Sequence, residues 1–316
     1  MANVPMKTLQ IETTSRCTLK CPACSRTWWN ETLKKKIPIG DIDIEMLYKF
    51  LDCEKGREIK MLDLRGDWGD CIYYPKLFDF IDKFRKEKNF TICTNGAWQT
   101  EKFWNRLSAI LVEGDVVEFS IDGLEDTNHL YRRNSDWKSL MLALRIIKNS
   151  KARMVWKTRV FKFNQNILPE MKKTAEDLGA EFSHEITHRF GDESLRPTEN
   201  FVDEDWTYKP DRTVNKIVPR CKRIDEYNYP SVSYYNMFFP CGWFCAPQVL
   251  YKSELWKNRE KWMIKDTTLD EMWENVVLPW AKNIEDNPAK ASILCQTKCN
   301  ASLQDRNTAV TKLEME

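Results

Sequence analysis

The sequence predicts an α/β protein built around a parallel sheet, followed by a different, cysteine-rich C-terminal part. Two observations predict this division. Strand-like and helix-like segments alternate from Thr8 to about His188, and five of the eleven cysteines lie beyond residue 220. Alternation of this kind is typical of parallel sheets whose strands are connected by helices. The sheet is then either doubly wound or part of a (β/α) barrel.

Six strands and five helices are predicted in the first part. Alternating apolar residues predict the strands, and apolar residues three or four positions apart predict the helices. The expected strands cover residues 9–13, 59–64, 90–94, 116–121, 154–161 and 181–186, and the expected helices cover 44–51, 77–84, 103–111, 140–147 and 171–178. In both kinds of parallel sheet, functional residues lie after the carboxyl ends of the strands.

The last third of the chain loses this alternation. Residues 191–220 are polar and without periodicity, which predicts a linker between a first domain, 1–190, and a C-terminal domain, 221–316. Aromatic residues and cysteines are frequent in the C-terminal domain. A hairpin is expected at 232–239 and an amphipathic helix at 268–280.

Composition and charge narrow the possible functions. The formal net charge is only +2, so no global attraction to nucleic acid or acidic lipid is expected. No apolar run is long enough for a membrane helix, and the first residues do not form a signal peptide. We therefore expect a cytoplasmic protein, in which cysteines are reduced. The isolated Cys53, Cys71 and Cys93 are then predicted to be core residues.

Three cysteines directly follow the first predicted strand, as Cys17-x3-Cys21-x2-Cys24. Thiolates are soft ligands that suit iron–sulfur clusters or zinc. Three thiolates leave one iron of a four-iron cluster open to a small molecule. A zinc site is the alternative, but it needs a fourth ligand. The only histidines, His129, His184 and His188, are far away in sequence.

This triplet resembles that of the radical S-adenosylmethionine superfamily, although Ala23 stands where the family usually has an aromatic residue. The resemblance implies a partial (β/α)6 TIM-type barrel. It also implies an oxygen-sensitive [4Fe-4S] cluster on Cys17, Cys21 and Cys24 whose open iron binds S-adenosylmethionine. In that family the reduced cluster donates an electron, which yields methionine and a 5′-deoxyadenosyl radical that abstracts hydrogen from the substrate.

The resemblance extends to the ends of the next strands. Gly69 and Asp70 match a Gly-Gly-Glu element that receives the methionine amino group, and Arg132 matches an arginine that pairs with the cofactor carboxylate. The remaining matching positions, which include two alternatives for a ribose contact, are Thr94, Asn95, Ser120, Asp122, and Asn164 or Asn166. From the residues alone, 65–70 is also compatible with an ordinary glycine-rich turn, and Arg132 and Arg133 with a solvated pair.

Glu12, on the first strand, faces either the substrate or the outside of the sheet. No catalytic residue is assigned.

The second cysteine set resembles a Twitch domain, a shortened SPASM domain that holds one auxiliary [4Fe-4S] cluster. The resemblance implies Cys221, Cys241, Cys295 and Cys299 as ligands, with Cys245 left over as an alternate. A structural zinc site on the same thiols is the alternative.

Together these features predict a radical S-adenosylmethionine oxidoreductase. Its auxiliary cluster would accept an electron from the substrate, and a flavodoxin or ferredoxin would supply the electron for cofactor cleavage. A small substrate such as a sugar or aminocyclitol is favoured, because the cysteine motif begins close to Met1. The alternatives are a peptide-modifying enzyme of the same kind, a non-catalytic zinc scaffold and an RNA-modifying enzyme. The balanced charge argues against the last of these.

Overall fold

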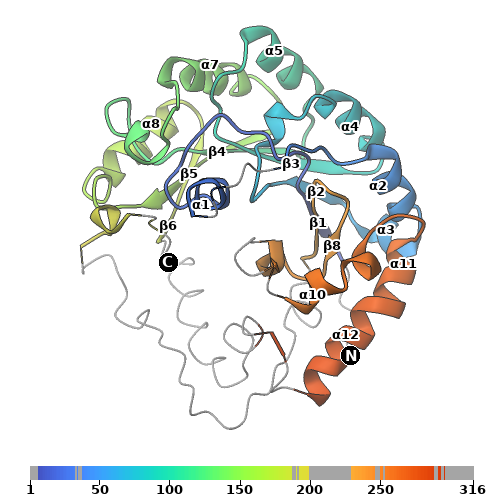
Figure 1. Ribbon diagram of the computed structural model, residues 1–316. Coiled ribbons are helices and arrows are strands. Elements are labelled where there is room, and N and C mark those ends of the chain that lie inside the picture. The colour runs from blue at the N-terminus through green and yellow to red at the C-terminus, as the bar shows by residue number, and fades with distance from the viewer. Residues whose placement is uncertain are drawn as a thin grey trace.

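Six parallel strands lie in one curved sheet in the same order as in the sequence (Figure 1). A doubly wound sheet would reverse its strand order at a switch point. The sequential order therefore identifies the predicted partial (β/α)6 barrel. The strands are β1 (Thr8–Ile11), β2 (Met61–Leu64), β3 (Asn89–Thr94), β4 (Val116–Ser120), β5 (Arg153–Val160) and β6 (Glu181–Ile186).

The computed structural model describes most of the barrel and part of the C-terminal third. The described residues are 6–32, 34, 38–186, 190, 192–198, 229–245, 250, 251, 253–287, 291, 292 and 295. No helix among them is both long enough and apolar enough to cross a lipid bilayer.

Helices follow the strands and lie along the outer side of the curved sheet (Figure 1). Side-chain caps begin several of them: Asp43 accepts a hydrogen bond from the Met46 amide, and Thr100 accepts one from Phe103. The helices of the barrel are α2 (Ile44–Leu51), α3 (Glu54–Glu58), α4 (Leu77–Phe84), α5 (Glu101–Ile110), α6 (Asn128–Tyr131), α7 (Trp137–Ile147) and α8 (Leu168–Asp177). All five predicted helices are confirmed, whereas α3 and α6 were not predicted.

The two faces of the sheet have opposite character. Leu62, Phe90 and Val117 are fully buried on one face, in the apolar core that the helices complete. Since successive residues of a strand face opposite sides, the neighbouring positions face the interior of the barrel. Most of those positions are polar, and toward the carboxyl ends of the strands they are Gln10, Asp63, Cys93, Glu118, Ser120, Lys157, Arg159 and Glu185.

The chain returns to the first strand in its C-terminal third. The strand β7 (Ser231–Val232) pairs in parallel with β1, and β8 (Phe238–Phe239) pairs antiparallel with β7. The hairpin expected at 232–239 is therefore confirmed, and it extends the barrel sheet. The predicted boundaries at 190 and 220 fall largely outside the described residues.

The helix expected at 268–280 is confirmed and continues to Asp286. It consists of α11 (Leu269–Met272), a π-helical turn (Trp273–Val277) and α12 (Leu278–Asp286). Pro279 has no amide hydrogen to donate in the first turn of α12, and a wider turn before it accommodates this defect. Asp270 of α11 accepts hydrogen bonds from the amides of Glu54 and Lys55, which attaches this helix to α3.

Asp115 is the buried carboxylate at the start of the central strands. Its oxygens accept hydrogen bonds from the amides of Phe90 (2.9 Å) and Val112 (3.0 Å), and it forms an ion pair with Arg85 at 2.8 Å. We expect Asp115→Ala to lower the free energy of unfolding by about 3–5 kcal/mol, because it leaves a largely buried cation unpaired. Urea unfolding measures this loss. The exposed Asp126→Ala is the control, with an expected change within about 0.5 kcal/mol. Equal effects of both variants would contradict the assignment.

Candidate active site at the carboxyl ends of the strands

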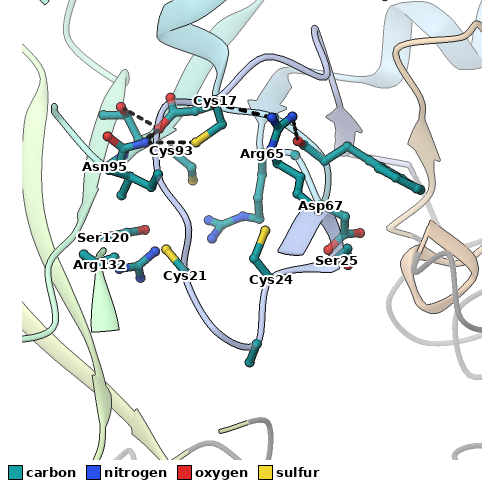
Figure 2. Close-up of a pocket in the computed structure, with 18 of the residues that line it drawn as sticks. Cys17, Cys21, Cys24, Ser25, Arg65, Asp67, Cys93, Asn95, Ser120 and Arg132 are labelled. Carbon is teal, nitrogen blue, oxygen red and sulfur yellow. Dashed lines mark hydrogen bonds between the residues drawn. The ribbon is translucent and has the colours of Figure 1, made fainter. Parts of the chain in front are cut away.

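The three clustered cysteines lie on one loop above the carboxyl end of β1. Their sulfur atoms point into a common cavity (Figure 2). The Cys24 amide donates to the Cys21 carbonyl oxygen (3.1 Å), which closes a turn, and α1 (Ser25–Thr32) begins directly afterwards. The cavity also contains residues from the ends of β2, β3 and β4, so the loop is placed where the sequence predicted function.

Arg26, which the sequence analysis did not identify, connects this loop to the next one. Its guanidinium donates to the carbonyl oxygens of Ser15 and Cys17 on the cysteine loop, and to that of Trp68 (3.0 Å) after β2. One side chain therefore fixes the spacing between the two loops that form this wall of the cavity.

The segment 65–70 packs tightly against the cysteine loop. A β-carbon at Gly69 would collide directly with the Thr14 carbonyl group, so only glycine fits there. The Asp70 amide donates to the Arg16 carbonyl oxygen at 2.8 Å. Glu12 is buried and accepts a hydrogen bond from the Trp68 amide at 2.5 Å. Glu12 thus supports the turn, a role different from both alternatives considered from the sequence.

The Asp70 carboxylate joins the predicted residues of β2 and β3. One oxygen, Oδ2, accepts hydrogen bonds from the Thr94 hydroxyl (3.1 Å) and from the Asn95 amide (2.7 Å) and side chain (2.5 Å). The other oxygen accepts only from the Ile72 amide at 3.2 Å among the described residues. Burial raises the Asp70 pKa to about 6, and the hydrogen bonds oppose this rise. Asn95 Nδ2 also lies 3.6 Å from Cys17 Sγ.

Arg132 lies on the opposite wall, near Cys21 and Ser120 (Figure 2). Its Nε is 2.5 Å from Oδ2 of Asp122, and the two side chains are 17% and 0% exposed. The ion pair with Asp122 raises the Arg132 pKa despite the burial. Arg132 is therefore a largely buried cation held by an ion pair, whereas Arg133 is exposed. The solvated-pair alternative is wrong for Arg132.

The cysteine thiols have the chemistry of metal ligands. Burial raises the pKa of Cys17 to about 12 and that of Cys21 to about 11. Thiols in this setting lose their protons when a metal supplies the compensating positive charge. Among the described residues, no three His, Cys, Asp or Glu side chains are grouped closely enough to hold a single metal ion. A polynuclear cluster takes one thiolate at each of several iron atoms, and Cys17, Cys21 and Cys24 supply three thiols that line one cavity.

The ribose-contact candidates lie outside the cavity wall. Asn164 is fully buried, and its amide is engaged with Phe161, Asp122 and Arg159 at 2.7–2.8 Å. Asn166 is exposed and is not among the residues that line the cavity. His129 and His184 are also exposed, and His188 lies outside the described residues.

The second cysteine set is described in part. Cys241 and Cys245 are buried beside the β7–β8 hairpin, and the sulfur of Cys245 lies 2.9 Å from the Ser231 hydroxyl. Cys295 packs, partly buried, against the main core. Cys221 and Cys299 lie outside the described residues. None of the described cysteines forms a disulfide.

Several residues of the cavity were missed by the sequence analysis. Cys53 and Cys71 are core residues as predicted, but the prediction for Cys93 is wrong because it lines the cavity beside Arg65. Arg159, at the end of β5, also faces the cavity. Their positions in the sequence could have identified them, because both residues lie at inward-facing sites near the carboxyl ends of predicted strands.

Comparison with solved structures agrees with this geometry. SuiB of Streptococcus suis bound to S-adenosylmethionine aligns with a TM-score of 0.52 at 12% identity, over 81% of this chain and 65% of SuiB. The structure of anSMEcpe with bound AdoMet aligns with a TM-score of 0.56 at 15% identity, over 93% and 85% of the two chains. The chain has the fold of radical S-adenosylmethionine enzymes. At these identities, the likeness concerns the fold.

Sequence comparison finds a more limited match. No protein-family model matches the chain. This chain is 34% identical over 122 residues to the tungsten-containing aldehyde ferredoxin oxidoreductase cofactor-modifying protein of Pyrococcus furiosus. The match covers 38% of this chain and 32% of that relative, so it spans about a third of the relative's length.

The contact at Gly69 gives a test of how this radical S-adenosylmethionine fold holds its two loops together. We expect Gly69→Ala to lower the free energy of unfolding by about 1–3 kcal/mol, because the added methyl group forces the loops apart. Chemical denaturation measures the change. Gly242→Ala is the matched control, since among the described residues its new β-carbon would meet only Gln10 Oε1 at an ordinary 3.5 Å. A neutral Gly69→Ala would show that the two loops are not in contact.

Proposed function

We propose that the chain is an enzyme that cleaves S-adenosylmethionine reductively and abstracts hydrogen from a substrate held in the barrel. The observation that supports this most strongly is the convergence of Cys17, Cys21 and Cys24 on one cavity with Asp70 and Arg132. When bound to these thiolates, a [4Fe-4S] cluster supplies the electron that yields methionine and a 5′-deoxyadenosyl radical.

The residues around the thiols have complementary tasks in this proposal. Asp70 Oδ1 has remaining acceptor capacity and can receive the cofactor ammonium group. The Arg132 guanidinium, held by Asp122, suits the cofactor carboxylate. Ser120 lines the same wall and offers a hydroxyl to the sugar or methionine part. Oppositely charged groups on two walls would orient a zwitterion in one direction.

The finer features of the function are also proposals. Cys221, Cys241, Cys295 and Cys299 would hold an auxiliary [4Fe-4S] cluster that accepts an electron from the substrate, with Cys245 as alternate. The substrate would be a small molecule, with a peptide as the alternative, and a flavodoxin or ferredoxin would be the electron donor. Two proposed members of this set, Cys241 and Cys295, are described, and both contact the core that includes the β7–β8 hairpin.

Replacing the three thiols tests the cluster. In anaerobically purified Cys17→Ala/Cys21→Ala/Cys24→Ala protein, we expect the loss of about four iron and four sulfide per chain. Reduced wild type should form 5′-deoxyadenosine from S-adenosylmethionine, and the variant should not. Cys53→Ala, in the apolar core, should keep the full iron content. Zinc at the triplet in freshly prepared wild type, or no 5′-deoxyadenosine from it, would overturn the proposal.

Replacing Asp70 tests the cofactor orientation. Asp70→Asn keeps the shape of the side chain but removes the charge that would attract the ammonium group. We expect the affinity for S-adenosylmethionine to fall about 10-fold or more, because a charge-assisted hydrogen bond is worth about 1.5–3 kcal/mol. Equilibrium binding to reconstituted protein measures this, with iron content as the check on integrity. The exposed Asp126→Asn serves as control, and unchanged affinity in Asp70→Asn would refute the role.

A further inference from the structure

The inner face of the barrel carries a continuous row of ion pairs, which we call the lumen ion row. Complete barrels of this type fill their interior with apolar side chains, so a charged interior indicates a polar ligand. The pairs are Arg65–Asp63 at 3.0 Å, Arg65–Glu118 at 2.7 Å, Lys157–Glu118 at 3.9 Å, Lys157–Glu185 at 2.5 Å and Arg159–Glu185 at 3.0 Å.

Arg159 is the member of the row whose guanidinium nitrogens are not all bonded to described residues, and it lines the cavity. Arg65 engages all three of its guanidinium nitrogens with Asp63 and Glu118. Arg159 gives only Nη1 to Glu185 and makes no other side-chain hydrogen bond to a residue that the structure describes. Its side chain is 35% exposed and lines the cavity. Among the described residues, nothing occupies Nε and Nη2, which form one edge of the guanidinium, so this edge can bind a ligand.

The backbone of Arg159 is held from both sides. Its amide donates to Oδ1 of Asp122 at 2.7 Å, and its carbonyl oxygen accepts from Asn164 Nδ2 at 2.8 Å. Both partners are fully buried. The same Asp122 carboxylate pairs with Arg132, so one buried group positions two arginines. A residue whose backbone is fixed in advance loses less conformational entropy when it binds a ligand.

We propose that Arg159 binds an oxyanion of the substrate, either a carboxylate or a phosphate, inside the barrel. Two parallel N–H groups match two oxygens of such a group, and the planar guanidinium holds these donors in a fixed geometry. The inference rests on the proposed function for the reaction that follows, and it adds the substrate class: a polar small molecule with an anionic group. Arg132 is left for the cofactor carboxylate.

Anion binding to the reconstituted protein tests this site. Inorganic phosphate and succinate are titrated by calorimetry with saturating S-adenosylmethionine present. The anion that binds with the higher affinity shows whether the site prefers a phosphate or a carboxylate. We expect Arg159→Gln to weaken binding of that anion by about 10- to 100-fold. Arg153→Gln is the matched control, because Arg153 forms the same kind of β5–β6 pair, with Glu181 at 2.6 Å, at the opposite end of the strand. Its affinity should match wild type.

A second variant separates binding from a structural role. Glu185→Gln removes the negative charge that competes for Arg159, so we expect it to bind the anion several-fold more tightly while Arg159→Gln binds it more weakly. Equal affinities in wild type and Arg159→Gln, or no binding of either anion to wild type, would overturn the proposal. Arg159-dependent binding in a protein that forms no 5′-deoxyadenosine would support this site while refuting the proposed reaction.

Discussion

The site depends on one buried carboxylate, that of Asp70. It lies where the loops after β1, β2 and β3 meet, and each loop contributes a hydrogen bond to this residue or receives one from it. A buried carboxylate without partners is costly, so the Asp70 carboxylate favours contact between the loops after β2 and β3. The Asp70 amide attaches the cysteine loop to them through the Arg16 carbonyl oxygen. The position of Cys17 relative to Asn95 follows from this arrangement. The geometry of the cysteine loop is therefore set by contacts outside that loop.

Asp122 has the corresponding role on the other wall. It connects β4 to the end of β5 and holds Arg132 in an ion pair. Each wall of the cavity thus contains one buried aspartate, Asp70 or Asp122, whose hydrogen-bond and ion-pair partners lie at the ends of neighbouring strands. The acid of the first wall keeps acceptor capacity toward the cavity, and the second wall presents a cation. Their separation across the cysteine loop gives the site a direction, which a symmetric ring of charges would lack.

The sequence alone predicted the strands and most of the helices of the barrel, and it predicted part of the candidate site. Apolar periodicity identified all six barrel strands and five helices, because each helix needs a continuous apolar stripe such as Leu77, Phe80 and Phe84. The cysteine spacing and the polar strand ends located the cavity. Short helices such as α3 carry too few residues to show a period. Arg26 and Glu12 could not be assigned, because their partners are backbone groups of another loop, and such partners leave no pattern in the sequence. Cys93 was predicted to be a core residue because its neighbours in the sequence are apolar. Those neighbours are buried on the opposite face of β3, whereas Cys93 faces the cavity.

The pairing of β7 with β1 affects how the protein is made. During synthesis β1 has one neighbour, β2, until Ser231 and Val232 have left the ribosome. The strand that leads into the cysteine loop therefore stays at the rim of the growing sheet until more than two thirds of the chain exists. Interruption of translation before that point would leave a partial barrel with the cysteine loop beside an unpaired strand, which is a site for wrong pairing with other chains.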